Sequence, residues 1–261
     1  MHKLPILTYH KISNSKEFGL TTVSPKKFKH QMQFLKSEGF ESVGFDQLID
    51  HRVLPEKPVI ITFDDGYENV YTEAFPILAA LDFKGVVFVV TDFLGKYNSW
   101  ESASFQKRHK HLSYIQIIEM KKAGWEIGSH GRKHNYLPAL NDEELEDEIA
   151  GSKRNLETII DERVISFSYP YGRHSARVIK SVQKAGYAFA TSNISVNRES
   201  GLNPYTLIRR SIYSTDTLNL FKNKLTVQKH LSPAYISEYI IQNGAFASIG
   251  LNMLRRHFIK F

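Results

Sequence analysis

The sequence contains no cysteine, which excludes disulfide bonds and thiolate metal sites. It also lacks any uncharged stretch with both the length and the apolarity of a transmembrane helix. No nucleic-acid-binding module, internal repeat or low-complexity segment is visible, so nucleic acid is not an expected partner. The sequence therefore predicts a soluble, folded protein.

Basic residues outnumber acidic ones, with 34 Lys and Arg against 27 Asp and Glu and a net charge of +7. This balance favours anionic partners such as phosphorylated or lipid-linked precursors. The positive charge is dispersed, however, and solvated surface residues explain it better. Residues 1–3 lead directly into an apolar strand without the core of a signal peptide, so we expect a cytoplasmic location.

Apolar runs alternate with amphipathic helical segments about seven times along the 261 residues. The expected strands cover residues 4–10, 59–63, 85–90, 125–127, 165–168, 187–191 and 206–212. This order predicts an α/β protein, with a parallel sheet closed or nearly closed into a distorted (β/α)7-type barrel. We expect the barrel domain to span residues 1–232 and a helical extension to span residues 233–261.

Helix starts are marked by residues that cap the first turn. Ser24 precedes Pro25, a residue favoured at the first helical position. Ser113 with Gln116, and Asn141 with Glu144 three residues on, predict two further helix starts. A helix is also expected over residues 70–81.

Two adjacent carboxylates end the buried strand at residues 59–63. Asp64 and Asp65 are followed by Gly66, which permits a sharp turn. Like charges this close raise each other's pKa, and a divalent cation is the commonest way to neutralise them. An ordinary turn in which one aspartate caps the next helix is the alternative interpretation.

Other residues that can carry chemistry also fall at the expected carboxyl ends of strands, where barrel enzymes build their active sites. These are His10, His130, His134 and Tyr171. The spacing of His130 and His134 places both on one side of a helical turn, where they can hold one metal ion. Two surface histidines are the simpler alternative. Joined to a carboxylate, the pair becomes a two-histidine, one-carboxylate site with open positions for water and substrate.

Three motifs occur in register: TFDDG at residues 62–66, SHGRKH at 129–134 and PYG at 170–172. Over roughly residues 4–215, the sequence resembles the polysaccharide deacetylases with the NodB homology domain (carbohydrate esterase family 4). LTYH at residues 7–10 and FSYPYG at 167–172 are most similar to the branch that contains the poly-N-acetylglucosamine deacetylases.

The resemblance implies a metal-dependent hydrolase that removes N-acetyl groups from an N-acetylated glycan or its lipid-linked precursor. By this resemblance Asp64 is the catalytic base, and the Tyr171 N–H stabilises the oxyanion. One divalent ion, expected to be Zn²⁺ with Co²⁺ or Ni²⁺ as alternatives, is bound by three residues: Asp65, His130 and His134. His10 is the candidate for a supporting catalytic role. The expected substrate-binding residues are Tyr67, Trp100, Pro170 and Arg173.

The sequence departs from the family pattern at two places. Ser168 stands where many members carry an arginine that orients the catalytic aspartate. The late Leu-…-His motif that supplies the general acid is not recognisable, and residues 206–210 contain arginines but no histidine. Two other functions therefore stay open: a carbohydrate-binding pseudoenzyme that keeps the metal site, and an amidohydrolase that acts on a small non-sugar amide.

Two segments fall outside the regular alternation. Residues 91–111 form a long polar insertion, and we expect it to border the substrate groove with Trp100 or Phe105 facing a sugar ring. Residues 233–261 end in basic residues after an apolar stretch, which fits a helix packed on the barrel or an interfacial helix on anionic membrane. We expect a monomer whose main partner is an N-acetylated carbohydrate.

Overall fold

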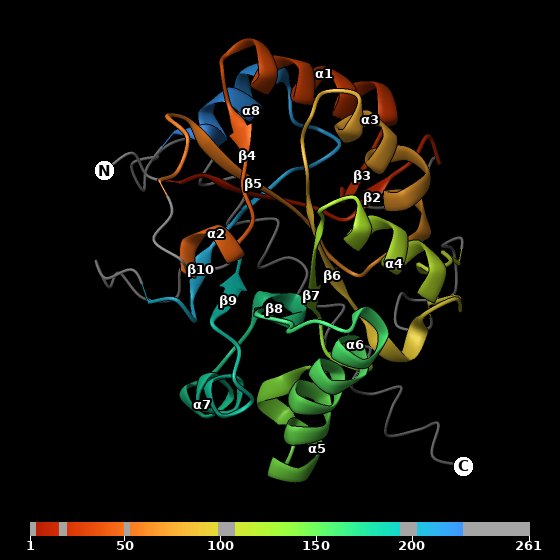
Figure 1. Cartoon of the computed structure of the whole chain (residues 1–261), viewed down its shortest axis with the longest axis vertical. Helices are drawn as coiled ribbons and strands as arrows, with labels where there is room; N and C mark the ends of the chain where they lie inside the picture. The colour runs from red at the N-terminus through yellow and green to blue at the C-terminus, as the bar shows by residue number, and fades with distance from the viewer. Residues whose placement is uncertain (1–3, 16–19, 50–52, 99–107, 194–202, 227–261) are drawn as a thin grey trace.

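A parallel sheet curls into a barrel at the centre of the protein, with helices arranged around it (Figure 1). The computed structural model describes residues 4–15, 20–49, 53–98, 108–193 and 203–226. The strands follow one another around the barrel in the order β10-β9-β8-β7-β6-β5-β1-β11. Their bounds are β1 Ile6–Tyr9, β5 Pro58–Phe63, β6 Val86–Val89, β7 Glu126–Ser129, β8 Ser166–Ser168, β9 Phe189–Ser192, β10 Leu207–Ile208 and β11 Arg210–Ser211. All pairings along this path are parallel, as expected from the alternation of strands and helices.

The barrel is closed by a single stretch of chain that is divided at Arg209. β10 pairs with β9, and β11 pairs with β1 at the other end of the strand order. Between them, the Arg209 N–H donates a hydrogen bond to the Ser192 carbonyl at 3.0 Å. The strand expected over residues 206–212 therefore joins both edges of the sheet, and the predicted distorted (β/α)7 barrel is confirmed.

The helices begin at the capping residues expected from the sequence. Ser24 accepts the Lys27 N–H at 3.3 Å, and capping boxes start the helices after Ser113 and Asn141. The bounds are α1 Pro25–Ser37, α2 Asp46–Ile49, α3 Phe75–Ala79, α4 Tyr114–Lys122, α5 Asp142–Glu146, α6 Ser152–Ile160, α7 Ala176–Lys184 and α8 Leu218–Leu225. The helix expected at residues 70–81 begins with a π-helical segment, Val70–Ala74, before α3. A second π-helical segment, Asp147–Gly151, joins α5 to α6.

Alternation along the strands separates an outer core from an inner one. The outer core packs the helices onto the sheet, and includes Ile61 and Phe63 of β5. A smaller cluster draws on strands from all around the barrel and so fills its interior: Ile6, Ile60, Val86 and Phe88, with Phe189 and Leu207 packed against them. Since side chains alternate along a strand, Thr62 and then Asp64 continue the inward row above Ile60. β5 therefore delivers Asp64 into the mouth of the barrel.

Three short strands lie beside the barrel: β2 (Lys11–Ile12) pairs with β3 (Thr22–Val23), and β4 (Glu41–Ser42) pairs with the start of β5. Among the helices that the structure describes, none is long and apolar enough to cross a membrane. Trp100, Phe105 and the extension expected at residues 233–261 lie outside the described residues, so the predictions made for them, and the domain boundary at residue 232, stay predictions.

Candidate active site

Asp64 and Asp65 turn apart at the end of β5. The Asp64 N–H continues the strand ladder by donating to the Tyr9 carbonyl at 2.9 Å. Asp65 and Gly66 then both take a left-handed conformation, with φ of 69° and 66°. A Cβ on Gly66 would lie 3.3 Å from the Val89 Cα, so a glycine suits both the turn and the close approach to β6. Because of this tight turn, the two carboxylates point in different directions and contact different partners.

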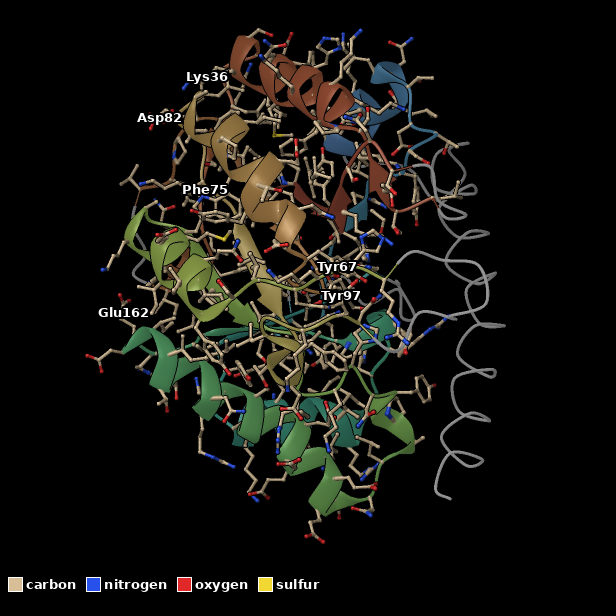
Figure 2. The ribbon with its side chains drawn as sticks, turned by 90° about the vertical axis from the view of Figure 1, so that its right-hand side faces the viewer. Lys36, Tyr67, Phe75, Asp82, Tyr97 and Glu162 are labelled. Carbon is tan, nitrogen blue, oxygen red and sulfur yellow. The ribbon has the colours of Figure 1, made fainter. Side chains whose placement is uncertain are left out.

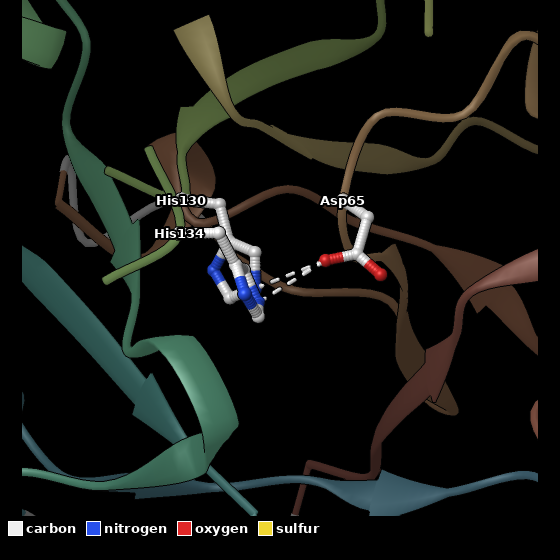
Figure 3. A group of neighbouring side chains, drawn as sticks. All are labelled: Asp65, His130 and His134. Atoms are coloured by element: carbon white, nitrogen blue, oxygen red, sulfur yellow. Dashed lines mark ion pairs between the residues drawn. The ribbon is translucent and has the colours of Figure 1, made fainter. Parts of the chain in front are cut away.

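Asp65 faces His130 and His134, which come from the loop after β7 (Figure 3). The Asp65 Oδ1 lies 3.5 Å from the His130 Nε2 and 3.4 Å from the His134 Nε2, and all three side chains are buried. Tetrahedral zinc with bonds of about 2.0–2.1 Å holds its ligand atoms about 3.3 Å apart. The three residues therefore fit a zinc-sized ion, and the sequence-based prediction that they lie together is confirmed by the geometry.

The expected helical turn between the two histidines is wrong. In the structure the segment from His130 to His134 is an irregular loop, and His134 has a φ of 57°. The His130 Nδ1 lies 2.7 Å from the Ser168 carbonyl, which leaves the Nε2 directed at Asp65. Burial lowers the pKa of His130, and the neutral ring is the form that binds metal. The loop, and not helical periodicity, brings the rings together.

Asp64 is paired with Arg209, whose side chain is fully buried in the mouth of the barrel. The Arg209 Nη1 and Nη2 donate to the two carboxylate oxygens at 2.7 Å and 2.6 Å. The same guanidinium donates to the Thr62 Oγ1 at 3.2 Å and to the Ser168 Oγ at 2.9 Å. Burial opposes ionisation of Asp64, but the charge and the hydrogen bonds of Arg209 outweigh it, so the pKa of this carboxyl lies well below its usual range.

Arg209 is the main site residue that sequence reasoning missed. Ser168, where the resemblance leads one to expect an arginine, instead accepts a hydrogen bond from this arginine of another strand. A signal was available, because a charged residue in the middle of the strand expected over residues 206–212 needs a buried partner. Sequence alone did not indicate that this partner is Asp64, which is 145 positions away.

His10 and Tyr171 lie on the same rim. His10 follows β1, and burial lowers its pKa to about 4 even though the Asp64 charge acts in the opposite direction. The Tyr171 ring centroid lies 4.5 Å from that of His134, and the Tyr171 backbone is left-handed, with a φ of 60°. Of the expected substrate contacts nearby, Pro170 is buried and Arg173 is partly exposed.

Tyr67, an expected substrate contact, is fully buried and lies next to the described part of the 91–111 insertion. Its backbone forms an antiparallel bridge with His111, and Tyr97 forms another with Lys110. Figure 2 shows Tyr67 and Tyr97 close together, next to these two bridges. The His111 Nδ1 also lies 2.8 Å from the Asp65 carbonyl oxygen. The insertion thus contacts the turn that carries Asp65, and the Tyr67 ring packs against two histidines of the insertion, His109 and His111.

A carboxylate held by an arginine stands next to a buried aspartate and two histidines, at the carboxyl end of a parallel barrel. This arrangement defines a hydrolase site with a candidate metal-binding group. Comparison with known proteins agrees: a family model described as polysaccharide deacetylase matches residues 51–190. The chain belongs to the polysaccharide deacetylase family, whose members are hydrolases that act on carbon–nitrogen bonds, and its barrel is the NodB-type fold.

Individual relatives support this assignment. The Bacillus subtilis protein YxkH, whose name places it among the polysaccharide deacetylases, is 30% identical over 207 residues, which cover 77% of this chain and 68% of YxkH. A poly-beta-1,6-N-acetyl-D-glucosamine N-deacetylase from Staphylococcus epidermidis is 27% identical, over 68% of this chain and 63% of the relative. The crystal structure of BC0361, a polysaccharide deacetylase from Bacillus cereus, superposes with a TM-score of 0.72 at 27% identity, covering 85% of this chain and 69% of BC0361.

Proposed function

We propose that the protein is a metal-dependent N-deacetylase that removes acetyl groups from an N-acetylated glycan. The observation that carries the proposal is the pairing of Asp64 with Arg209 beside the group of Asp65, His130 and His134. The similarity to a poly-beta-1,6-N-acetyl-D-glucosamine N-deacetylase supports a polymer of N-acetylglucosamine as the substrate class. A lipid-linked precursor of such a polymer is a second substrate form.

Asp65, His130 and His134 would hold one divalent ion, for which Zn²⁺ is the first candidate. Such an ion polarises an amide carbonyl and lowers the pKa of bound water toward neutrality. The protein's contribution begins with Asp64, whose carboxylate stays ionised because Arg209 donates to both of its oxygens. In the proposed reaction an oxygen of Asp64 accepts the proton of the attacking water.

The remaining steps need an oxyanion donor and a proton for the leaving amine. We assign the first to the Tyr171 N–H, since a well-placed backbone donor contributes about 3 kcal/mol to such a transition state. His10 lies in the electrostatic field of Asp64, and its low pKa means that it is neutral at rest. It therefore needs a proton before it can act as the acid. In the proposed reaction Asp64 passes on the proton that it took from the attacking water, and His10 then donates that proton to the amine.

Acetate release from N-acetylglucosamine oligomers, followed by mass spectrometry, tests the proposal. In Asp64→Asn we expect kcat to fall about 10²- to 10⁴-fold, because the proton acceptor is lost, while the zinc content stays near that of the wild type. Loss of zinc together with activity would instead make Asp64 a metal ligand. Binding of oligomers without acetate release by the wild type would favour the carbohydrate-binding pseudoenzyme, and turnover of small non-sugar amides alone would favour the amidohydrolase.

The cytoplasmic location and the contact with anionic membrane stay proposals. The first was expected from residues 1–3 and the second from residues 233–261, and both segments lie outside the described structure. Flotation with anionic and neutral liposomes, comparing the full chain with a version that ends near residue 231, tests the membrane contact. Equal flotation of the two would contradict it.

A further inference from the structure

The loop that carries both histidines is organised around one buried carboxylate. Glu148 lies in the π-helical segment between α5 and α6, and only 2% of its surface is exposed. Its Oε2 accepts the backbone N–H groups of Arg132 at 2.9 Å and Lys133 at 3.1 Å. Its Oε1 accepts the side-chain amide of Asn135 at 2.5 Å. Three donors within four consecutive residues of the loop therefore converge on a single side chain.

Gly131 makes this approach feasible. Its φ is +82°, a conformation that glycine adopts without strain. A Cβ at this position would lie 2.8 Å from the Glu148 Oε2, closer than a carbon and an oxygen can pack. Both the backbone conformation and the empty space beside Gly131 thus fit the presence of the Glu148 carboxylate.

The opposite side of the loop is tied to the end of β6. The Thr91 N–H donates to the Gly131 carbonyl at 3.2 Å, and the Asp92 N–H donates to the Arg132 carbonyl at 3.0 Å. The Arg132 guanidinium bonds to Asp92 at 3.0 Å and to Asp147 at 2.5 Å. The carbonyl groups of the loop are therefore held from one side, and its N–H groups are held by Glu148 from the other.

We propose that Glu148 is a positioning residue for the metal-binding group: it holds the loop in the conformation in which the His130 and His134 Nε2 atoms both face Asp65. This inference rests on the proposed function, because it concerns the same metal site. A buried carboxylate is stable only when its oxygens are hydrogen-bonded, and charge-assisted bonds to backbone N–H groups are short and strong. Partners outside the ligand set fix ligand orientation, and their removal typically costs about 10- to 100-fold in metal affinity.

Zinc affinity of the full chain, measured by competition with a chromophoric chelator, tests the proposal. We expect Glu148→Ala to weaken zinc binding about 10- to 100-fold. In Glu148→Gln the amide oxygen can still accept the two N–H groups once Asn135 turns its side-chain oxygen toward the new amide, so we expect a loss of less than about 10-fold. Glu146→Gln is the matched control, since it removes the same charge two residues earlier and its carboxylate bonds to Lys184 rather than to the loop.

Hydrogen exchange of the metal-free protein gives a second readout. In Glu148→Ala the amides of Arg132 and Lys133 should exchange faster, with β-strand amides unchanged. Wild-type zinc affinity and wild-type exchange in Glu148→Ala would overturn the positioning role and leave the proposed metal site intact, provided that His130→Ala loses zinc. Equal zinc binding by His130→Ala and the wild type would overturn the metal site itself, and the positioning role with it.

Discussion

At the scale of single residues, the pairing of Arg209 with Asp64 decides what the site can do. A buried carboxylate without a partner would gain a proton and lose its capacity as a base. The two short hydrogen bonds from Arg209 keep Asp64 ionised and fix the direction of its oxygens. The same bonds make Asp64 a weak base in water, so its contribution depends on being correctly placed rather than on a high proton affinity.

We expect Arg209→Lys to lower kcat about 100-fold and to leave KM and zinc content close to the wild type. A lysine keeps the positive charge, but it cannot donate to both Asp64 oxygens in the planar geometry of a guanidinium. Steady-state kinetics on an acetylated oligomer and zinc titration check both parts. Arg210→Lys, one residue along the chain, is the control. Equal activity of Arg209→Lys and the control would show that Arg209 only fills space.

Residue identities near the motifs could be predicted from the sequence, whereas long-range partners could not. Asp65, His130 and His134 were found because residue type and strand position both point to metal binding. Arg209 was visible as an arginine in an expected strand, but its partner depends on how the barrel closes. Glu148 gave no signal, because an acidic residue in an amphipathic helix is typical of a solvated face.

At the scale of the elements, β7 carries a partly buried carboxylate at the opposite end from the histidines. Glu126 accepts the N–H groups of Phe45 at 2.7 Å and Asp46 at 3.3 Å, and the Ser166 hydroxyl at 2.5 Å. It thereby joins β7 to the start of α2 and to β8. Burial, which outweighs these hydrogen bonds, raises the pKa of Glu126 to about 7. The fold therefore favours the protonated form of this side chain.

This raised pKa predicts a pH dependence of stability. The folded-state pKa of Glu126 exceeds the ordinary value of 4.5. The contribution of Glu126 to stability is therefore complete below about pH 4.5 and is lost as the pH rises through about 7. We expect Glu126→Gln, which mimics the protonated form, to unfold at a higher denaturant concentration than the wild type at about pH 8. The gain should be about 3 kcal/mol at most.

Urea unfolding of both proteins across the range from about pH 5 to pH 8 provides the measurement. The difference between them should shrink toward acidic pH, where Glu126 is protonated in the wild type. Asp82→Asn, in an exposed turn after α3, is a control for removing a carboxylate elsewhere. A constant difference between Glu126→Gln and the wild type over this range would contradict the titration of Glu126.

Element boundaries could be predicted where they depend on neighbouring residues in the sequence, but not where they depend on pairing with distant strands. The helix starts at Ser24, Ser113 and Asn141 were predicted because a cap involves residues within one turn. The division of the last strand at Arg209 was not, because it arises from pairing with β9 on one side and β1 on the other. The histidine spacing fitted a helical turn equally well, and only the contacts of the loop with other elements exclude it.

At the scale of the whole molecule, the candidate metal group connects separate parts of the barrel. Asp65 comes from the end of β5, the two histidines come from the loop after β7, and His130 is also bonded to Ser168 of β8. In the sheet, β6 lies between β5 and β7 and pairs with both of them. A bound ion would therefore act as a cross-link over the open end of the barrel, and binding would be coupled to global stability.

We expect zinc to raise the melting temperature of the metal-depleted protein in a concentration-dependent way. A ligand at about 1,000 times its Kd stabilises the folded state by about 4 kcal/mol, which corresponds to roughly 10 °C for a domain of this size. His134→Ala removes one ligand and should show a much smaller shift at the same zinc concentration. His109→Ala is the matched control, because this residue is also buried near the rim but is not one of the three ligands. Differential scanning calorimetry of the three proteins, with and without zinc, provides the measurement. An equal shift in His134→Ala and the wild type would place the stabilising ion elsewhere in the molecule.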